Sequence, residues 1–571
     1  MARDPEGVYP LRMAEKPRLF RDPVHDTIAL PRDTPLGRLL VELLDTPEMQ
    51  RLRRIRQLGL TGLVYPGAEH SRFQHSLGVL WLAHQMVQRL SHHHAITEEE
   101  QELALLGALL HDVGHGPMSH ALEAVTGLRH ERWTEAVLLS PDTHIGRILA
   151  TRDRDLPGRL VSLYAKSPLP DGLRPFVRDI VSSQLDADRL DYILRDGVAT
   201  GVRIGHYDIA RILALIDLAD GHLAVHGGAL EAVEGYLLAR FHMYKQVYLH
   251  KTSRAAERML EATLKRAGDL HREGRGPDFW PAGPLGELIA VSEPGARPVA
   301  PPIPVERYAS LDDTDVWLAL KHWSRDADTW LAALAGGLVD RRLWKPIPLP
   351  EDPGRAEELV HAARSLARVK GFDPEQSVLV DATRDSLYKP FTGAANRHEG
   401  SIRILGGDGR AAFIEDRSSV VRMLANLEVR QRLICVYPPL KPHITRMLAR
   451  FSARARASAG LEGAWVSGAR PASSRPARAR APARSCRARA RGCCSDRRPP
   501  CRPSRRGGRR GAAQGRRQPP RREARGEARP PPERGARARC RRAATRRSLA
   551  PRRGRRRPRT RARRLADARG S

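Results

Sequence analysis

Residues 111–120 of the chain are His111-Asp112-Val113-Gly114-His115-Gly116-Pro117-Met118-Ser119-His120. The sequence just before them predicts a helix, because Thr97-Glu98-Glu99-Glu100 has the form of a capping box and the leucines that follow recur at helical spacing. Gly114 can adopt the left-handed conformation that ends a helix. We therefore expect His111 and Asp112 at the buried end of a helix, where the helix breaks.

The side chains of this stretch are those of a transition-metal site. An imidazole and a carboxylate side by side, near two more histidines, offer the ligand atoms that such metals bind. A lone His-Asp pair would more often be a buried histidine next to an acidic helix end. Three histidines in this stretch, with similar segments on both sides, favour the metal site over that alternative.

A second group of histidines lies upstream. Arg72-Phe73-Gln74-His75 begins a segment with helical spacing of apolar residues, which predicts a helix over residues 72–90. His92-His93-His94 follows this helix in a polar joint, and we interpret that run as a surface loop rather than a metal cluster.

A helix over residues 184–196 is the second informative segment. Asp188, Tyr192 and Asp196 are spaced four residues apart, so they share one face of it. A surface helix with alternating charges would have a similar sequence. Two acids and a tyrosine on one stripe, however, are better suited to contact a metal and a sugar.

Residues 36–58 predict two helices. The first covers residues 36–44, and Asp45-Thr46-Pro47 breaks it and caps the second, because Asp or Thr accepts hydrogen bonds from free helix N–H groups and Pro is tolerated in the first turn. The second helix carries residues 50–58, with a cationic face that is either solvated or in contact with a phosphate or base.

The remaining sequence predicts a mainly α-helical protein with a few short strands. His130-Glu131 begins a helix with Trp133 and Val137 on its inner side, and a long helix covers residues 233–251. A shorter helix is expected over residues 210–219. The strands are expected at residues 223–226, 378–380, 401–405, 411–414 and 435–437.

Charge and cysteine content divide the chain near residue 450. From Phe451 to Ser571 there are 40 arginines, no lysine and six acidic residues, a net charge of +34 against +33 for the whole chain. The body before residue 451 is therefore nearly neutral, and Cys435 is its one cysteine, which fits a reducing compartment. No segment approaches the ~20 apolar residues of a membrane helix, and no secretory signal is visible, so we expect a soluble cytoplasmic protein.

The arginine-rich segment from residue 451 should be disordered, because its composition offers too little apolar surface to offset chain entropy. Such a tail could bind RNA or DNA. We prefer out-of-frame translation of a GC-rich gene, because the dominant residue types have GC-rich codons and selection for positive charge alone would not exclude lysine.

Together these segments resemble the HD-domain phosphohydrolases, and within them the deoxynucleoside triphosphate triphosphohydrolases, which include the vertebrate SAM-and-HD-domain enzyme and bacterial relatives. The resemblance rests on Arg72–His75, His111–His120, His130-Glu131 and Asp186–Tyr192. It covers about residues 21–251 and, more weakly, continues to about residue 450, without a sterile-alpha-motif domain. It implies an HD-domain helical core at residues 18–251 and a smaller α+β region at residues 252–450. Composition places a flexible N-terminus at residues 1–17 and the disordered tail at residues 451–571.

This resemblance implies a metal held by His75, His111, Asp112 and Asp188. Fe, Mn, Zn or Ni would suit two imidazoles and two carboxylates, with Mg²⁺ on the substrate phosphates. The implied reaction is attack of metal-bound water at the α-phosphorus of a deoxynucleoside triphosphate (dNTP), which releases deoxynucleoside and triphosphate. The residues implied to contact phosphates, transfer protons or orient these groups are His115, His120, His130, Glu123 and Glu131.

The resemblance also implies how the substrate is held. Tyr192 would pack under the sugar, where a 2′-hydroxyl would clash, and Asp196 would accept a hydrogen bond from the 3′-hydroxyl. Arg189 stands where some relatives have lysine, which changes the geometry of phosphate binding. The other residues implied to contact phosphate, sugar or base are Gln57, Leu58, Arg72, Arg240, Tyr248 and Lys251.

Asp45, Gln50 and Arg53 match the allosteric guanine-nucleotide site of that family. Asp can accept hydrogen bonds from N1–H and N2–H₂ of guanine, and Arg can donate to O6 and N7. A helix cap with solvated charges explains the same residues equally well. The regulatory interpretation implies GTP or dGTP as activator and a homodimer or homotetramer, with the helix over residues 50–58 joining the effector and substrate pockets.

Two other functions remain to be weighed. An HD phosphodiesterase or phosphatase could act on another nucleotide, although the GYP motif common in cyclic-dinucleotide phosphodiesterases is absent near His111. A nucleic-acid-binding protein would depend on the tail alone, because the body is nearly neutral.

Overall fold

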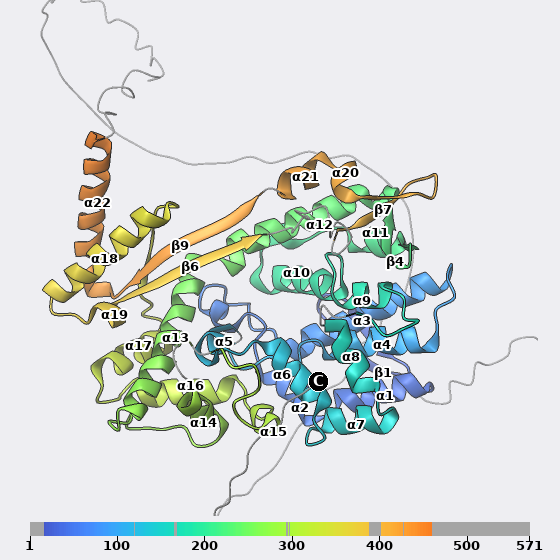
Figure 1. Ribbon diagram of the computed structural model, residues 1–571, viewed down its shortest axis with the longest axis horizontal. Helices are drawn as coiled ribbons and strands as arrows, with labels where there is room; N and C mark the ends of the chain where they lie inside the picture. Colours follow the sequence, from blue (N-terminus) through green and yellow to red (C-terminus); the bar gives the residue numbers. More distant parts are fainter. Residues whose placement is uncertain are drawn as a thin grey trace, which may run out of the picture. The chain divides into compact units, whose positions relative to one another are not determined.

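The structure is a computed structural model, and it describes residues 16–118, 120–164, 168–292, 295, 297–386, 401–425 and 427–458 (Figure 1). The described chain is mainly helical with small sheets, which confirms the expected fold class. Most of the predicted tail lies outside the described residues. Its first part, residues 451–458, instead completes helix α22 (Lys441–Ser458).

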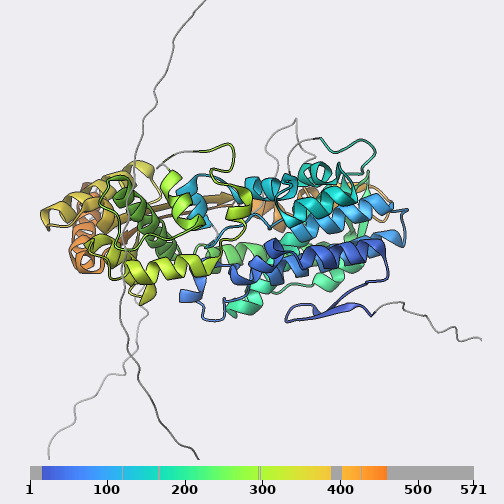
Figure 2. The same cartoon turned by 90° about the horizontal axis from the view of Figure 1, so that it is seen from below.

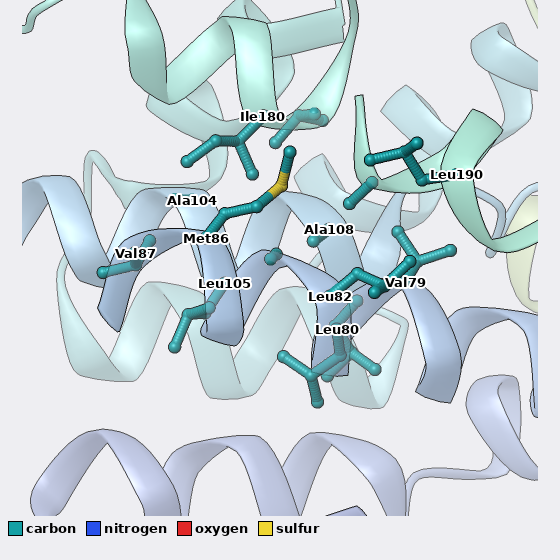
Figure 3. Packing of buried hydrophobic residues seen from close by; sticks show 14 of the residues in the cluster. Val79, Leu80, Leu82, Met86, Val87, Ala104, Leu105, Ala108, Ile180 and Leu190 are labelled. Carbon is teal, nitrogen blue, oxygen red and sulfur yellow. The ribbon is translucent and has the colours of Figure 1, made fainter. Parts of the chain in front are cut away.

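The N-terminal helices enclose one apolar core. Its centre lies where α3 packs against α4, with Leu82 and Met86 on α3 facing Ala104 and Ala108 on α4 (Figure 3). Capping boxes begin both helices: Ser71 with Gln74 in α3, and the predicted Thr97 with Glu100 in α4. The helices of this part are α1 (Pro35–Leu44), α2 (Pro47–Arg51), α3 (Arg72–Ser91), α4 (Glu98–Leu110), α5 (His120–Thr126), α6 (His130–Leu139), α7 (His144–Arg152), α8 (Leu156–Tyr164), α9 (Phe176–Val181), α10 (Ala187–Thr200), α11 (Ile209–Ala214) and α12 (Leu230–Met243).

Three sheets accompany these helices among the described residues. β1 (Arg18–Asp22) and β2 (Asp26–Leu30) form an antiparallel hairpin at the edge of the helical core (Figure 2). The second sheet has the order β3 (Ile216–Ala219), β4 (His222–His226), β7 (Arg403–Leu405) and β8 (Ala411–Phe413), and β4 and β7 run parallel. The helix predicted to continue to residue 219 was wrong at this end, because residues 216–219 pair with β4 as strand β3. The third has the order β5 (Lys345–Pro348), β9 (Glu428–Val436) and β6 (Val378–Ser386).

A second apolar cluster lies around α13 (Lys251–Arg272), which packs against α5 and α17. The segment around β7 returns to the first core, where Ile402, Ile404 and Val421 are buried. The boundary at residue 251 stays a prediction. The remaining helices are α14 (Pro284–Val291), α15 (Val305–Tyr308), α16 (Asp313–Trp323), α17 (Thr329–Val339), α18 (Pro353–Val369), α19 (Pro374–Ser377), α20 (Ile414–Arg417) and α21 (Ser419–Ala425).

The predicted role of Gly114 was wrong. Gly114 is not among the residues with positive φ, so no left-handed residue ends α4 at this point. The glycine is required by packing: a Cβ there would lie 2.1 Å from the backbone nitrogen of Thr134 and 2.5 Å from the carbonyl oxygen of His130. Gly114 therefore allows the loop after α4 to lie directly on α6.

The helix predicted over residues 50–58 was also wrong. α2 passes into one 3₁₀ turn, η1 (Leu52–Arg54), and Ile55 is extended with φ −112° and ψ 116°. Long-range partners take the next backbone groups, because Arg56 N donates to Asp313 and Gln57 N donates to the carbonyl oxygen of His70 at 3.0 Å. Gln57 and Leu58 therefore do not lie on the helix that carries Gln50.

The long helix predicted over residues 233–251 is interrupted. α12 continues as a wider π-helical turn, η5 (Tyr244–Tyr248), which ends at Leu249. His250 then caps the next helix, α13. This break places Tyr248 and Lys251 on different elements. Among the described residues, no helix is both long and apolar enough to cross a membrane.

Candidate active site

Three helix ends bring the predicted metal ligands together. His75 lies in the first turns of α3, His111 and Asp112 directly follow α4, and Asp188 lies in the first turn of α10. His75 Nε2 is 3.0 Å from Asp188 Oδ1 and 3.9 Å from Asp112 Oδ2. His111 Nε2 is 3.4 Å from Asp112 Oδ1 and 3.6 Å from Asp188 Oδ1. The ligand atoms of His75, His111 and Asp112 lie within 4.8 Å of one another. An oxygen of Asp188 faces both histidines, so these side chains can surround one ion.

The ring of His111 is oriented for a ligand. Its Nδ1 donates to the carbonyl oxygen of Ala108 at 2.8 Å, which leaves Nε2 with a lone pair. This Nε2 is buried and has no hydrogen-bond partner among the described residues. A buried acceptor without a donor is costly, and a metal ion between His111, Asp112 and Asp188 would remove that cost. The residues present therefore fit a metal ion.

Interactions between the charged groups of this cluster affect their pKa values more than burial does. Burial alone would lower the pKa of His75, yet hydrogen bonds to Asp188 and Asp191 raise it to about 10. Burial alone would raise the pKa of Asp188, whereas His111 and His75 hold it well below its usual range. Without a metal, a proton on His75 therefore neutralises part of the carboxylate charge.

His115 and His130 lie on the other side of Asp112. His115 Nε2 is 3.3 Å from Asp112 Oδ1, and the two imidazoles stack with their centroids 3.6 Å apart and their planes at 16°. Their ligand atoms and that of Asp112 lie within 4.8 Å of one another. A metal lies close to the plane of each imidazole that binds it. Two nearly parallel planes this far apart share no such point, so this second group does not form a site for one ion in this arrangement.

The stacked histidines differ in their surroundings. Burial, Arg72 and His130 lower the pKa of His115 well below its usual range, so His115 is neutral at pH 7. His130 Nδ1 instead donates to Glu123 Oε1 at 2.7 Å. The structure thus places a neutral imidazole next to an imidazole that is hydrogen-bonded to a carboxylate.

Two of the residues predicted for proton transfer lie less centrally. Glu131 is half-exposed and is paired with Arg129, with one oxygen 3.7 Å from His130 Nδ1. His120 begins α5, and its side chain lies outside the described part of the chain.

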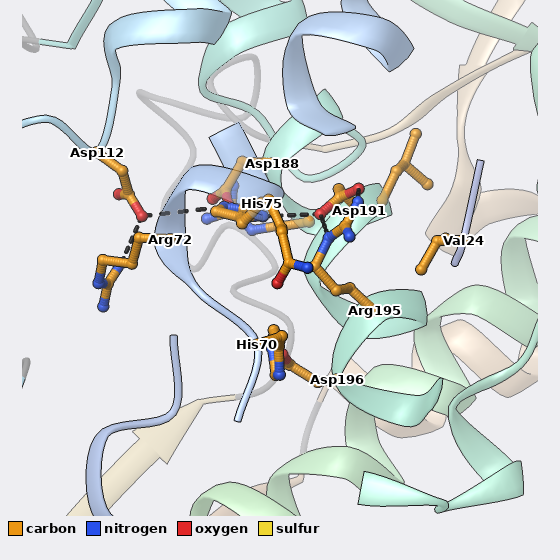
Figure 4. A network of polar contacts seen from close by, with 12 residues as sticks. Val24, His70, Arg72, His75, Asp112, Asp188, Asp191, Arg195 and Asp196 are labelled. Atoms are coloured by element: carbon orange, nitrogen blue, oxygen red, sulfur yellow. Dashed lines mark hydrogen bonds and ion pairs between the residues drawn. The ribbon is translucent and has the colours of Figure 1, made fainter. Parts of the chain in front are cut away.

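Of the predicted sugar-binding residues, Tyr192 lies next to His75, and Asp196 lies beside His70 (Figure 4). The ring of Tyr192 lies 6.5 Å from that of His75 and 6.1 Å from that of Tyr248. Tyr248 donates its hydroxyl to Asp196 Oδ2 at 2.7 Å, and His70 Nε2 lies 2.8 Å from Asp196 Oδ1. His70 was not predicted, because a single histidine two residues before Arg72 carries no signal of its own.

The predicted phosphate-binding residues are less uniformly placed. Arg72 is buried and donates to Asp112 Oδ2 at 2.5 Å, at the centre of the cluster. Arg189 is paired with Asp186, the cap of its own helix, and Arg240 donates to Gln184 Oε1 at 2.8 Å. Lys251 is exposed and lines a cavity of about 280 Å³ with residues 348–351 and 430–433, without a described contact to the histidines.

The segment of Gln57 and Leu58 lies close to the loop that follows α4. Gly59 has a φ of +49°, and a Cβ built on it would lie 3.5 Å from the carbonyl oxygen of Met118. Gln57 Oε1 is buried and has no hydrogen-bond partner among the described residues, so it can still accept one from a ligand. Leu58 is partly buried against the first core.

The sequence did not predict that Arg51 and Tyr308 hold the loop after α4 by hydrogen bonds to its backbone. Arg51 is fully buried and donates to three carbonyl oxygens, those of Leu311 at 2.7 Å, Val113 at 3.3 Å and His115 at 2.6 Å. Tyr308 donates its hydroxyl to the carbonyl oxygen of Gly114 at 3.0 Å. These partners are up to 260 residues apart in sequence, so no local pattern could reveal them.

The residues of the predicted effector site lie on the surface near α2. Gln50 accepts from Arg53 at 2.8 Å, and Arg53 also lies over the ring of Phe73. Asp45 is half-exposed and accepts from Arg18 at 2.5 Å. Thr46, not Asp45, is the side chain that caps α2. The helix-cap explanation for Asp45 is therefore wrong.

Comparison with known proteins gives this site a context. Models of the HD domain and of the HD associated region match residues 72–155 and 207–274. The uncharacterized protein YwfO of Bacillus subtilis is 32% identical over 418 residues, which cover 73% of this chain and 91% of that protein. The deoxynucleoside triphosphate triphosphohydrolase SAMHD1 of Danio rerio is 27% identical over 408 residues, which cover 64% of this chain and 62% of that protein. The crystal structure of a phosphohydrolase from Bacteroides thetaiotaomicron is similar to this structure with a TM-score of 0.60 and 32% identity. The match covers 74% of this chain and 100% of that one.

The helical core lies where the HD-domain model matches, with the His-Asp centre at its helix ends. The chain belongs to the HD-domain phosphohydrolases.

Proposed function

We propose that the protein hydrolyses dNTPs with the help of a divalent metal, releasing deoxynucleoside and triphosphate. One observation carries this proposal: Asp188, Tyr192 and Asp196 lie along one face of α10, so one helix presents a metal ligand, an aromatic ring and a carboxylate in a row. A nucleotide that places its phosphates at the histidines would place its sugar at Tyr192. SAMHD1, named as a dNTP triphosphohydrolase, supports the substrate class by its similarity.

The charge of the buried network supports a divalent cation. The carboxylates of Asp22, Asp112, Asp188 and Asp191 exceed the guanidinium groups of Arg72 and Arg195 by two negative charges when the histidines are neutral. An uncompensated buried charge is costly. One divalent ion would balance this network, and Fe, Mn, Zn or Ni all suit His75, His111, Asp112 and Asp188. The bound ion would polarise a phosphate oxygen and acidify a water molecule, while Mg²⁺ would accompany the substrate phosphates.

The residues around this ion divide the remaining work. Arg72, held by Asp112, offers its guanidinium group to a phosphate. Neutral His115 can accept a proton or a hydrogen bond. His130, oriented by Glu123, can donate a proton to the leaving 5′-oxygen. His120, Glu131, Arg189, Arg240 and Lys251 stay candidates for phosphate contact.

The sugar pocket follows from the same helix. Tyr192 would lie under the deoxyribose and exclude a 2′-hydroxyl. Asp196 has both oxygens engaged by His70 and Tyr248, and each carboxylate oxygen retains a further acceptor site for the 3′-hydroxyl. Gln57 and Leu58 would line the sugar and base.

A turnover panel tests the proposal. The full chain, stripped of metal and then supplied with Mn²⁺ or Mg²⁺, is incubated with each dNTP and each NTP. We expect metal-dependent hydrolysis of dNTPs and poor hydrolysis of NTPs. Equal turnover of GTP and dGTP would rule out the sugar assignment, and full turnover without metal would rule out the metal.

We also propose that GTP or dGTP at Asp45, Gln50 and Arg53 activates the enzyme in a homodimer or homotetramer. The expected route along one helix does not exist, because the helical segment ends at Arg54. Arg51 offers another route, since it joins α2 to the carbonyl oxygens of Val113 and His115. Allosteric coupling is typically worth about 1–3 kcal/mol, or roughly 5–150-fold in affinity. dATP turnover and oligomer size, measured with and without GTP, test this proposal, and Asp45→Ala should remove the stimulation while sparing metal binding.

A further inference from the structure

A second layer of buried groups surrounds the proposed metal ligand His75. His75 Nδ1 donates to Asp191 Oδ2 at 2.8 Å, which leaves Nε2 to face Asp188. Asp191 is completely buried. Its other oxygen, Oδ1, accepts from His25 Nε2 at 2.6 Å. Arg195 binds both oxygens, with Nε 2.7 Å from Oδ2 and Nη2 2.9 Å from Oδ1 (Figure 4).

His25 belongs to the turn of the β1–β2 hairpin, far from the metal ligands in sequence. Asp22 fixes this turn, because its Oδ1 accepts from the backbone nitrogens of Val24 at 2.9 Å and His25 at 3.0 Å. Asp22 also accepts from Arg195, at 2.8 Å and 3.2 Å. The hairpin turn is thus tied to α10 by two buried side chains, His25 and Asp22, through Asp191 and Arg195.

The approach of α3 to this network depends on Gly78. A Cβ at Gly78 would lie 2.0 Å from Asp191 Oδ1 and 2.4 Å from Arg195 Nη2. Gly78 lies one turn after His75, so the missing side chain is what allows Asp191 to reach the ring of His75. The carboxylate is therefore enclosed on all sides by α3, α10 and the hairpin turn.

We propose that His25, in the turn of the N-terminal hairpin, is a positioning residue for the metal site. His25 holds the carboxylate of Asp191, and this carboxylate fixes the ring of His75. This proposal rests on the proposed metal function of His75. A carboxylate that accepts from the second nitrogen of a ligating histidine fixes the orientation of the ring and keeps the lone pair of the other nitrogen toward the metal. Loss of the His25 bond would leave Asp191 with one donor fewer and the His75 ring less firmly held.

The test compares two histidines that make the same kind of bond. His25→Gln removes the imidazole from Asp191, and His226→Gln removes an imidazole from Asp217, which accepts from His226 Nε2 at 2.7 Å at the protein surface. The Mn²⁺ affinity of the full-length chain is measured by calorimetry for wild type and both variants, with thermal melting of each. Changes in the groups that orient metal ligands typically cost 10–100-fold in affinity.

We expect His25→Gln to bind Mn²⁺ at least tenfold more weakly than wild type, with His226→Gln unchanged. Saturating Mn²⁺ should restore the turnover number of His25→Gln, and the KM for dNTP should stay at the wild-type value, which a general loss of structure would not produce. If His25→Gln does not fold, Asp22→Asn weakens the hold on the same turn and should lower Mn²⁺ affinity in the same direction.

The outcomes separate this proposal from the one it rests on. A wild-type chain that binds no divalent metal would overturn both. A wild-type chain that binds Mn²⁺, with His25→Gln or Asp22→Asn folded and binding equally well, would overturn only the role of His25.

Discussion

Among the described residues, two of the clusters of histidine and aspartate differ in what surrounds them. In the first, the buried His75 and Asp112 and the partly buried His111 and Asp188 lie at helix ends in the helical core. In the second, Asp217 on β3 accepts from His94 at 2.5 Å and from His226 at 2.7 Å, and both histidines are partly exposed. Residue type alone therefore does not distinguish the two clusters.

The difference lies in the partners of each nitrogen. In the first cluster, the Nδ1 atoms of His75 and His111 already donate to Asp191 and to a backbone carbonyl, so both Nε2 atoms face the carboxylates. In the second, the Nε2 atoms of His94 and His226 are bonded to the two oxygens of one carboxylate. The Nδ1 partners of His75 and His111 turn the ligand atoms of the first cluster inward, as groups around a metal site do.

The largest expected effect comes from the carboxylate shared by the first cluster. Asp112→Asn should remove bound metal and lower dNTP turnover by at least about a thousandfold, because Asp112 contacts both the metal ligands and Arg72. Metal content by mass spectrometry and turnover are measured together. Asp217→Asn is the matched control and should retain both. Unchanged metal content and activity in Asp112→Asn would contradict the role of Asp112 as a metal ligand.

Removing the ring of Tyr192 should have a smaller effect and should leave metal content intact. Tyr192→Ala opens the space under the sugar, so discrimination between dGTP and GTP should fall by about 10–100-fold, the scale of a lost steric contact. The ratio of kcat/KM values for the two nucleotides measures this. An unchanged ratio would mean that another residue rejects the 2′-hydroxyl.

The proton on His75 predicts a pH dependence of metal binding. The pKa of His75 lies near 10 in the metal-free protein, above its ordinary value of 6.5, so below pH 10 a metal must displace this proton. Mn²⁺ affinity should therefore rise with pH, by about tenfold per unit between pH 6 and 8. Calorimetric titrations in buffers of different ionisation enthalpy would also count the proton released. An affinity that does not change over this range would contradict the hydrogen-bond pattern around His75.

The second cluster should contribute only to stability, and weakly. His94 and His226 lower the pKa of Asp217 despite its partial burial, so the stabilisation is present above the unfolded pKa of about 3.9 and is lost as pH falls through the lower folded value. Asp217→Asn should cost about 0.2–1 kcal/mol at pH 6, the range of exposed ion pairs. Urea unfolding at pH 6 and pH 3 measures the difference, which should be smaller at pH 3. A decrease of several kcal/mol in the free energy of unfolding would contradict a weak, surface contribution of this cluster.

Local patterns predicted the parts of the site that lie within single helices. The capping box at Thr97, the stripe of Asp188, Tyr192 and Asp196, and the surface position of the His92-His93-His94 run all follow from short-range spacing, and the structure has them as expected. The ligand roles themselves came from a resemblance and stay predictions.

The parts that were missed depend on contacts distant in sequence. His25 meets Asp191 across 166 residues, and Arg51 meets Leu311 across 260. The helix predicted through Gln57 failed because its backbone groups bind His70 and Asp313 instead. Tertiary partners overrode helix propensity there, and packing against α6 rather than backbone conformation explains Gly114.

The identity of the phosphate product, with the origin of its oxygen, is the most direct measurement of hydrolysis at the α-phosphorus. The full-length chain is incubated with dGTP and Mn²⁺ in water enriched in ¹⁸O, and the products are examined by ³¹P NMR and mass spectrometry. Attack at the α-phosphorus predicts deoxyguanosine without label and triphosphate with one ¹⁸O on a terminal phosphorus. Orthophosphate or pyrophosphate as the first product would contradict this account and would favour an HD phosphatase acting elsewhere on the nucleotide.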